Sequence, residues 1–169
     1  MPKQTTALNE KGLYISLAVT RILLGFIFLW AFLDKLFGLG FATPPERSWL
    51  QGGSPTAGFL SNVDGTFAAF FNSLAGVAIV DWLFMLGLLG VGVGLLLGIA
   101  MRLSILAGSA MLFLMWLAAL PLSTNPLIDD HIVYIAVLAI LWFELPRQHL
   151  GLGAYWRALP FVKNSSWLH

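Results

Sequence analysis

The sequence predicts an all-α integral membrane protein: a four-transmembrane-helix bundle with an amphipathic interfacial helix in a long first outer loop. Of its 169 residues, 59% are hydrophobic and only 10% are charged, whereas soluble domains are about half apolar and about a quarter charged. The apolar residues also gather into runs close to the ~20 residues that cross a hydrocarbon core of ~30 Å as a helix. We expect one membrane domain over residues 1–169.

The four expected spans are residues 13–34, 81–99, 103–122 and 126–145. Arg21 is the one charge inside the first apolar run, which is too long for a cleaved signal peptide and lacks a small-residue cleavage site. The second and third runs are too long together for one span, so a tight turn is expected near Arg102. The last run, 132–145, becomes a full span only if the helix begins near Pro126, with Asn125 as its cap.

The long connection between the first two spans predicts the interfacial helix. Its apolar residues recur at helical spacing over 57–74, which is typical of a helix lying in the membrane interface. Lysine and arginine in the short flanks predict the orientation. One side of the membrane would hold six of them and the other side only Lys35 and Arg47. We therefore expect a plasma-membrane protein with both termini cytoplasmic and Asp129–His131 facing outward.

Charge and composition disfavour several functions. A net charge of +1 offers no basic face for nucleic acid, and the absence of cysteine removes thiol, disulfide and iron–sulfur chemistry. The three histidines are scattered, so no haem and no metal site is expected. If electrons pass through this protein, a bound cofactor such as quinone or a partner redox subunit must carry them.

The candidate catalytic residues open the fourth span. Asp129, Asp130 and His131 stand together there, and Tyr134 shares a helical face with Asp130. An acid, an imidazole and a phenol can relay protons or hold a polar head group. The alternative is structural, because carboxylates near a helix N-terminus are stabilised by the helix dipole.

Other ionisable groups are expected at the same outer level. Asp34 and Lys35 end the first span, Asp81 opens the second, and Arg47 lies in the long loop. We expect Lys35 to act with the Asp129–His131 cluster, and Asp34, Arg47 and Asp81 to bind ligand beside it. Each of them could instead be an ordinary interfacial anchor.

Arg21 would lie roughly 12 Å inside the first span at 1.5 Å per residue. A charge at that depth should face the bundle interior. It would pair with Glu144 or serve as a counter-charge for an anionic ligand or semiquinone.

Two glycine patterns add weaker expectations. The segment "QGGSPTAGF" could fold as a backbone nest for an oxyanion or as a plain turn. Gly90, Gly94 and Gly98 fall four apart on one face, which lets another helix approach closely. That helix could belong to the same chain or to a partner in a homo- or hetero-oligomer.

The chain resembles the DoxX/DoxD family of small four-helix membrane proteins over nearly its whole length. The motifs are "RILLGFIFLWAFLDKLFGLGF", "GLLLGIAMRLSILAG", "NPLIDDHIVYIAVL" and "HLGLGAYWRALPFVK", and "GGSPTAGFL" with "IDDHIVY" is similar to the DoxD branch. The resemblance implies an association with thiosulfate:quinone oxidoreductase, in which DoxD works with a second subunit, DoxA. Many DoxX proteins carry a glutamate in the second helix, where this chain has apolar residues such as Leu86 and Leu88.

Two functions are weighed. In the first, the chain is the membrane subunit of a quinone-linked oxidoreductase that oxidises thiosulfate or a similar sulfur oxyanion at the outer face. Lys35 and Arg47 would attract the anion, and Arg21 would polarise a quinone carbonyl. In the second, it is a non-catalytic lipid- or quinone-binding or scaffold subunit of a larger membrane complex. A transporter is disfavoured because four helices show no inverted repeat.

Overall fold

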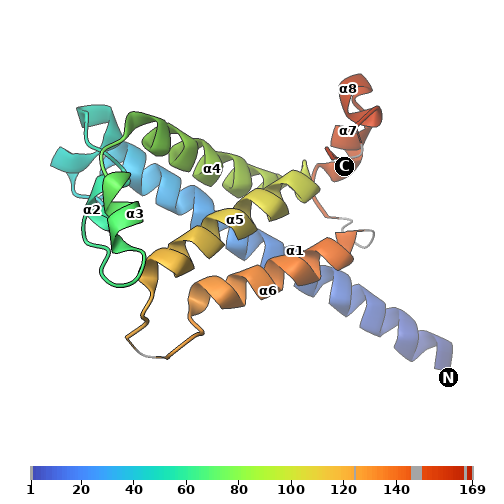
Figure 1. Cartoon of the computed structure of the whole chain (residues 1–169). Helices are drawn as coiled ribbons and strands as arrows, with labels where there is room; N and C mark the ends of the chain where they lie inside the picture. Colours follow the sequence, from blue (N-terminus) through green and yellow to red (C-terminus); the bar gives the residue numbers. More distant parts are fainter. Residues whose placement is uncertain (1, 124, 146–149, 166, 169) are drawn as a thin grey trace.

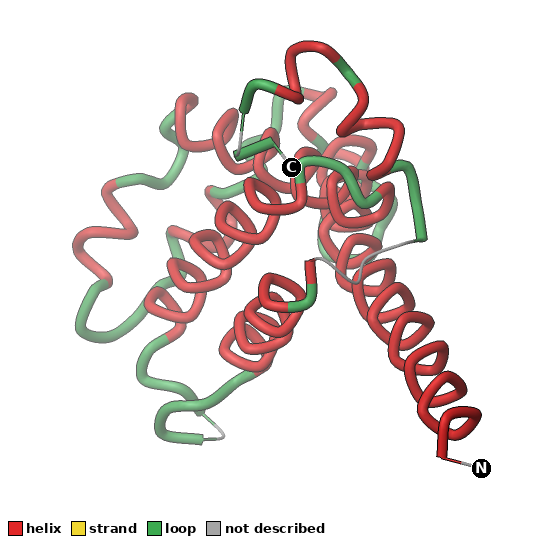
Figure 2. Tube along the Cα trace, turned by 90° about the vertical axis from the view of Figure 1, so that its right-hand side faces the viewer, coloured by secondary structure: helices red, strands yellow, loops and turns green. Residues whose placement is uncertain are grey.

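The computed structural model describes residues 2–123, 125–145, 150–165 and 167–168, and this part of the chain is built from helices joined by turns and loops (Figures 1 and 2). The longest helices are α1 (Pro2–Phe37), α4 (Ala78–Leu97), α5 (Met101–Ala119) and the shorter α6 (Asp130–Phe143). The connecting and terminal helices are η1 (Pro45–Arg47), η2 (Trp49–Gln51), α2 (Ala57–Leu60), α3 (Ala68–Ser73), α7 (Gly153–Ala158) and α8 (Pro160–Lys163).

Three helices are long and apolar enough to cross a membrane: Glu10–Phe37 within α1, Ala78–Leu97 and Met101–Ala119. Their outward faces carry large apolar side chains, such as Leu23 on α1 and Leu86 on α4, which are exposed. A surface of this kind suits lipid better than water. The sequence-based expectation of a helical membrane protein is therefore supported, with three long spans and a shorter apolar fourth helix.

The fourth helix is shorter than expected. The predicted beginning near Pro126 is wrong, because α6 begins at Asp130 and has 14 residues, about 21 Å at 1.5 Å per residue. Asn125 does not cap it: its side-chain oxygen accepts the N–H groups of Leu127 and Ile128, both at 2.9 Å. This local turn competes with helix formation, and Asp129 becomes the N-cap instead.

The single interfacial helix expected over 57–74 is also wrong. That segment forms two short helices, α2 and α3. Gly65 separates them with φ +97°, a left-handed conformation that ends regular helix. Leu60, Val63 and Phe71 are buried together against Ala118 of α5, so the segment folds onto the bundle.

The bundle is assembled by neighbouring helices: α1 packs on α4, α4 on α5, and α5 on α6 (Figure 1). Glycines allow the first pair to touch through their backbones. A Cβ on Gly92 would lie 2.7 Å from the backbone nitrogen of Leu29, and one on Gly25 would lie 2.7 Å from that of Leu96. The α1–α4 contact therefore depends on small residues, as in membrane helix pairs generally.

The predicted glycine stripe is used largely inside the chain. Gly94 is buried against Ser104 of α5, and Gly98 ends α4 in the left-handed conformation beside Arg21. A Cβ on Gly90 would meet nothing within 4 Å, and this glycine is exposed. The helix that approaches Gly94 thus belongs to the same chain, whereas oligomerisation through this face stays a prediction.

This packing predicts opposite effects for two glycines of α4. Gly92→Ala should lower the free energy of unfolding by about 1–3 kcal/mol, because the added methyl must push the α1 backbone away. Gly90→Ala, on the same helix, should leave stability unchanged or slightly raised. Thermal unfolding midpoints in one detergent would measure both, and equal behaviour of the two variants would contradict the close α1–α4 contact.

Candidate functional site

Asp34, near the end of α1, holds the start of the long loop between α1 and α4. Its side chain is only 2% exposed. One carboxylate oxygen accepts the N–H of Phe41 at 3.1 Å, and the other accepts the N–H of Ala42 at 3.0 Å. A buried carboxylate needs such donors. Both carboxylate oxygens of Asp34 therefore accept hydrogen bonds from the loop backbone.

Asp81, in the first turn of α4, holds the middle of the same loop. It is 6% exposed, and one oxygen accepts the Ser54 hydroxyl at 2.9 Å, the Thr56 hydroxyl at 2.5 Å and the Thr56 N–H at 3.2 Å. These hydrogen bonds hold residues 54–56 against the first turn of α4.

The oxyanion nest considered for "QGGSPTAGF" does not form. The N–H of Gly52 donates to the Trp49 carbonyl and that of Gly53 to the Ser48 carbonyl, both at 3.0 Å. These amides close a turn, so they are not turned together toward an anion. The second reading of this segment, a turn, is confirmed.

A pocket of about 850 Å³ lies between this loop and the adjoining ends of α1, α4 and α5. Among the residues that the structure describes, Lys35 and Arg47 are its charged lining residues, and hydroxyl groups come from Thr43, Ser54, Thr56 and Ser61. The larger part of the lining is apolar and includes Leu60, Phe71, Leu74, Val80, Leu83, Phe84, Met111, Leu114 and Met115.

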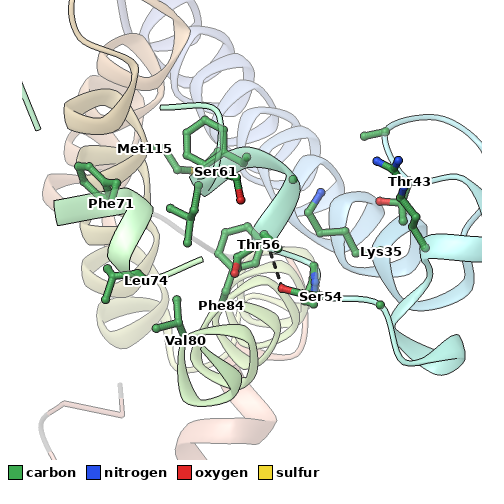
Figure 3. A pocket seen from close by; sticks show the side chains of 18 of the residues that line it. Lys35, Thr43, Ser54, Thr56, Ser61, Phe71, Leu74, Val80, Phe84 and Met115 are labelled. Atoms are coloured by element: carbon green, nitrogen blue, oxygen red, sulfur yellow. Dashed lines mark hydrogen bonds between the residues drawn. The ribbon is translucent and has the colours of Figure 1, made fainter. Parts of the chain in front are cut away.

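Lys35 lies away from much of the apolar lining (Figure 3). Figure 3 shows Phe71, Leu74, Val80 and Met115 on one side of the pocket, and Lys35 with Thr43 on the other. A volume of this size suits an organic ligand rather than a single small ion. The pocket can therefore accept a molecule with one polar or charged end and an apolar body.

The cluster that opens α6 is a separate feature, and none of its residues lines the pocket. His131 Nδ1 lies 2.7 Å from a carboxylate oxygen of Asp129 and 3.7 Å from one of Asp130. Asp129 also caps α6 by accepting the N–H of Ile132 at 3.3 Å. The three side chains could hold a metal ion by their spacing, but hydrogen bonding within the cluster and helix capping already account for the arrangement.

Capping and the imidazole set the pKa of Asp129. Partial burial by itself raises it, but the hydrogen bonds from His131 and from the Ile132 N–H, together with the imidazolium charge, outweigh that effect. The pKa of this carboxyl therefore lies below its ordinary value of 3.8.

Tyr134 and Arg21 lie away from the pocket. Tyr134 is half-buried against the main hydrophobic core. Arg21 is 1% exposed and donates from its guanidinium to the Leu150 carbonyl at 2.7 Å. A Cβ on Gly98 would collide with this guanidinium, and one on Gly151 would lie 2.6 Å from the Leu97 carbonyl oxygen and 3.1 Å from the guanidinium. Arg21 thus lies under the α4–α5 turn, at the opposite end of α4 from Asp81, and its pairing with Glu144 stays a prediction.

The residues of the expected outward-facing site are divided in the structure. Lys35 and Arg47 line one pocket. Asp34 and Asp81 accept hydrogen bonds from the loop that forms the wall of this pocket. Asp129, Asp130 and His131 form a cluster of their own. The sequence analysis missed the hydroxyls of Ser54 and Thr56 and the apolar wall residues. Ser54 and Thr56 flank Pro55, and their hydroxyls are suitable hydrogen-bond donors to a buried aspartate. Nothing in the sequence pattern indicated that Asp81 would be the acceptor.

No family model, curated protein or solved structure matches this chain.

Loss of the Asp81 anchor should release the loop. In Asp81→Ala, residues 52–60 should exchange backbone amides faster, because the Ser54 and Thr56 donors lose their acceptor at about 1.5–3 kcal/mol for a hydrogen bond to a charged group. Glu46→Ala, an exposed acid of the same loop, is the matched control. Hydrogen–deuterium exchange measures both, and unchanged exchange over 52–60 in Asp81→Ala would contradict the anchoring role.

The Asp129 cap should show a defined pH dependence. Because the folded-state pKa is lowered, its stabilising effect is present above pH 3.8 and is lost as the pH falls through the lowered pKa. The unfolding midpoint of the wild type should therefore exceed that of Asp129→Asn at neutral pH, and the difference should shrink below pH 4. Asp130→Asn is the control, since Asp130 lies more exposed. A difference that does not change with pH would refute the assignment.

Proposed function

We propose that this chain is a membrane subunit that binds a lipid-soluble amphiphile in its outer pocket, either alone or within a larger complex. The supporting observation is the lining of the pocket, which combines two cations and several hydroxyls with a larger apolar part. Two of the apolar wall residues, Leu83 and Leu114, are 64% and 51% exposed on the outside of α4 and α5. The pocket is therefore continuous with a face suited to lipid, through which a tail can leave.

The membrane arrangement in this proposal has four spans, with α6 as a short fourth one. The excess of lysine and arginine on the side of the termini supports a cytoplasmic position for both ends in the plasma membrane. The pocket and the α6 cluster then lie toward the outer surface. Oligomerisation and a partner subunit are part of the proposal, with Gly90 as the exposed member of the glycine stripe.

Blocking the pocket tests this function. Protein purified in lipid nanodiscs should retain bound lipid or quinone, detected by native mass spectrometry. Leu114→Trp, whose larger side chain narrows the pocket, should lower the fraction of protein that retains lipid or quinone severalfold by steric exclusion. Leu106→Trp, on the same helix and similarly exposed but outside the pocket lining, is the matched control. Equal retention by both variants and the wild type would rule out the pocket as the binding site.

A second candidate is the membrane subunit of a quinone-linked oxidoreductase acting on thiosulfate. It is favoured by the resemblance to the DoxD branch and by the presence of Lys35 and Arg47 in one pocket. Two thiosulfate ions would join through a new S–S bond to give tetrathionate and two electrons. The quinone would take up these electrons and two protons to give quinol. The chain would position the reactants, since it has no cysteine, and a DoxA-like subunit would complete the site.

Turnover assays distinguish the second candidate. Under it, thiosulfate-dependent quinone reduction in nanodiscs with co-purified partners should fall at least about tenfold in Lys35→Gln and Arg47→Gln, because each loses a charge-assisted hydrogen bond to the anion. Asp129→Asn and His131→Gln should change the rate only if the α6 cluster handles the protons. Absence of wild-type turnover while amphiphile binding persists would leave the binding subunit as the function.

A further inference from the structure

We propose that the ligand of this pocket is an anionic amphiphile, whose oxyanion head group binds Lys35 and Arg47 and whose apolar tail lies between α4 and α5. This inference rests on the proposed binding function and narrows it to one ligand class. It is carried by the charge balance of the pocket, by its size and by the position of its apolar opening.

The first step is that neither pocket cation forms a close ion pair within the described part of the chain. Among the described residues, no carboxylate forms an ion pair with Lys35 or Arg47 within 4.0 Å, and neither side chain has a hydrogen bond to another described residue. Lys35 is half-buried at the outer end of a membrane helix. An ammonium group in that position is costly unless an anion or a polar head group meets it.

The second step is that the nearby aspartates are hydrogen-bonded to the loop and form no ion pair with either cation within 4.0 Å. Asp34 offsets part of the Lys35 charge through space, while its two oxygens accept N–H groups of the loop. One oxygen of Asp81 accepts the donors of Ser54 and Thr56. Neither aspartate is among the pocket-lining residues. Among the described residues, the lining therefore presents two cations and no carboxylate, which favours a ligand with an anionic head group.

The third step is size. A free sulfur or phosphorus oxyanion has only about five heavy atoms and would leave most of about 850 Å³ empty. The apolar wall of Phe71, Leu74 and Met115 would then stay without a ligand contact, whereas an alkyl tail would bury apolar surface against it. Since Leu83 and Leu114 are exposed at the same wall, a longer tail can continue into the bilayer.

The fourth step separates this ligand from a quinone. Quinone carbonyls accept hydrogen bonds from lysine and hydroxyl groups, yet the head group is uncharged and leaves the two cations unneutralised. A phosphate, sulfonate or carboxylate head accepts charge-assisted hydrogen bonds from both, and the arginine fork suits a bidentate contact with its oxygens.

The experiment compares four probes on the purified full-length protein in neutral detergent: a phosphatidic acid, the phosphatidylcholine with the same acyl chains, decylubiquinone and inorganic phosphate. The phosphatidic acid should bind at least about tenfold more tightly than the other three. Lys35→Gln and Arg47→Gln should each weaken it about five- to tenfold and change phosphatidylcholine binding less than twofold. Lys35→Arg should restore the affinity, and Lys11→Gln, an exposed lysine near the other end of α1, should have no effect.

The outcomes separate the inference from the function on which it rests. Decylubiquinone could bind as tightly as the phosphatidic acid, lose affinity in Leu114→Trp and keep its affinity in Lys35→Gln and Arg47→Gln. In that case the binding function holds and the anionic ligand is refuted. If inorganic phosphate matches the lipid, the requirement for a tail is refuted. If no amphiphile binds, or if Leu114→Trp leaves all binding unchanged, the inference and the binding function both fail.

Discussion

The end of the protein that carries the pocket depends on two buried carboxylates, Asp34 and Asp81, that accept hydrogen bonds from a loop. Asp34 and Asp81 lie at the ends of α1 and α4, and each accepts donors from a loop segment that follows no regular secondary structure. Without these acceptors, the buried N–H and hydroxyl groups of the loop would lose their partners at a cost of about 1–3 kcal/mol each. The loop is thereby fixed across the helix ends, and the pocket exists because the loop is fixed.

The same arrangement sets the charge of the pocket. A bundle end with two aspartates beside one lysine and one arginine could neutralise itself through ion pairs. Here the acids accept backbone and hydroxyl donors, and among the described residues no carboxylate lies within 4.0 Å of the charged atoms of Lys35 or Arg47. Loop folding and ligand recognition are therefore coupled: a change that frees Asp81 from Ser54 and Thr56 would alter the wall of the pocket and its charge together.

Sequence patterns predicted the elements better than their ends or their contacts. The first three spans follow from apolar runs long enough to cross a bilayer, which local sequence determines. The start of α6 did not follow, because Asn125 and Asp129 are both good caps and a turn at Leu127 and Ile128 decides between them. Residues 57–74 have helical spacing, but Gly65 divides them. The residue types of the site were visible, yet which acid meets which donor is a tertiary property.

The cations near the two ends of α4 have different surroundings, and this difference explains why the pocket lies at one end. At the end near Gly98, the guanidinium of Arg21 is enclosed by the backbones of Gly98 and Gly151 and donates to the Leu150 carbonyl. Leu152 also donates its N–H to Leu97 at 2.8 Å, which ties the C-terminal segment to the α4–α5 turn. That end is closed around its cation. At the other end the acids hold the loop instead, so Lys35 and Arg47 line an open volume. Under our proposal, an anionic head group would bind there without displacing a protein group.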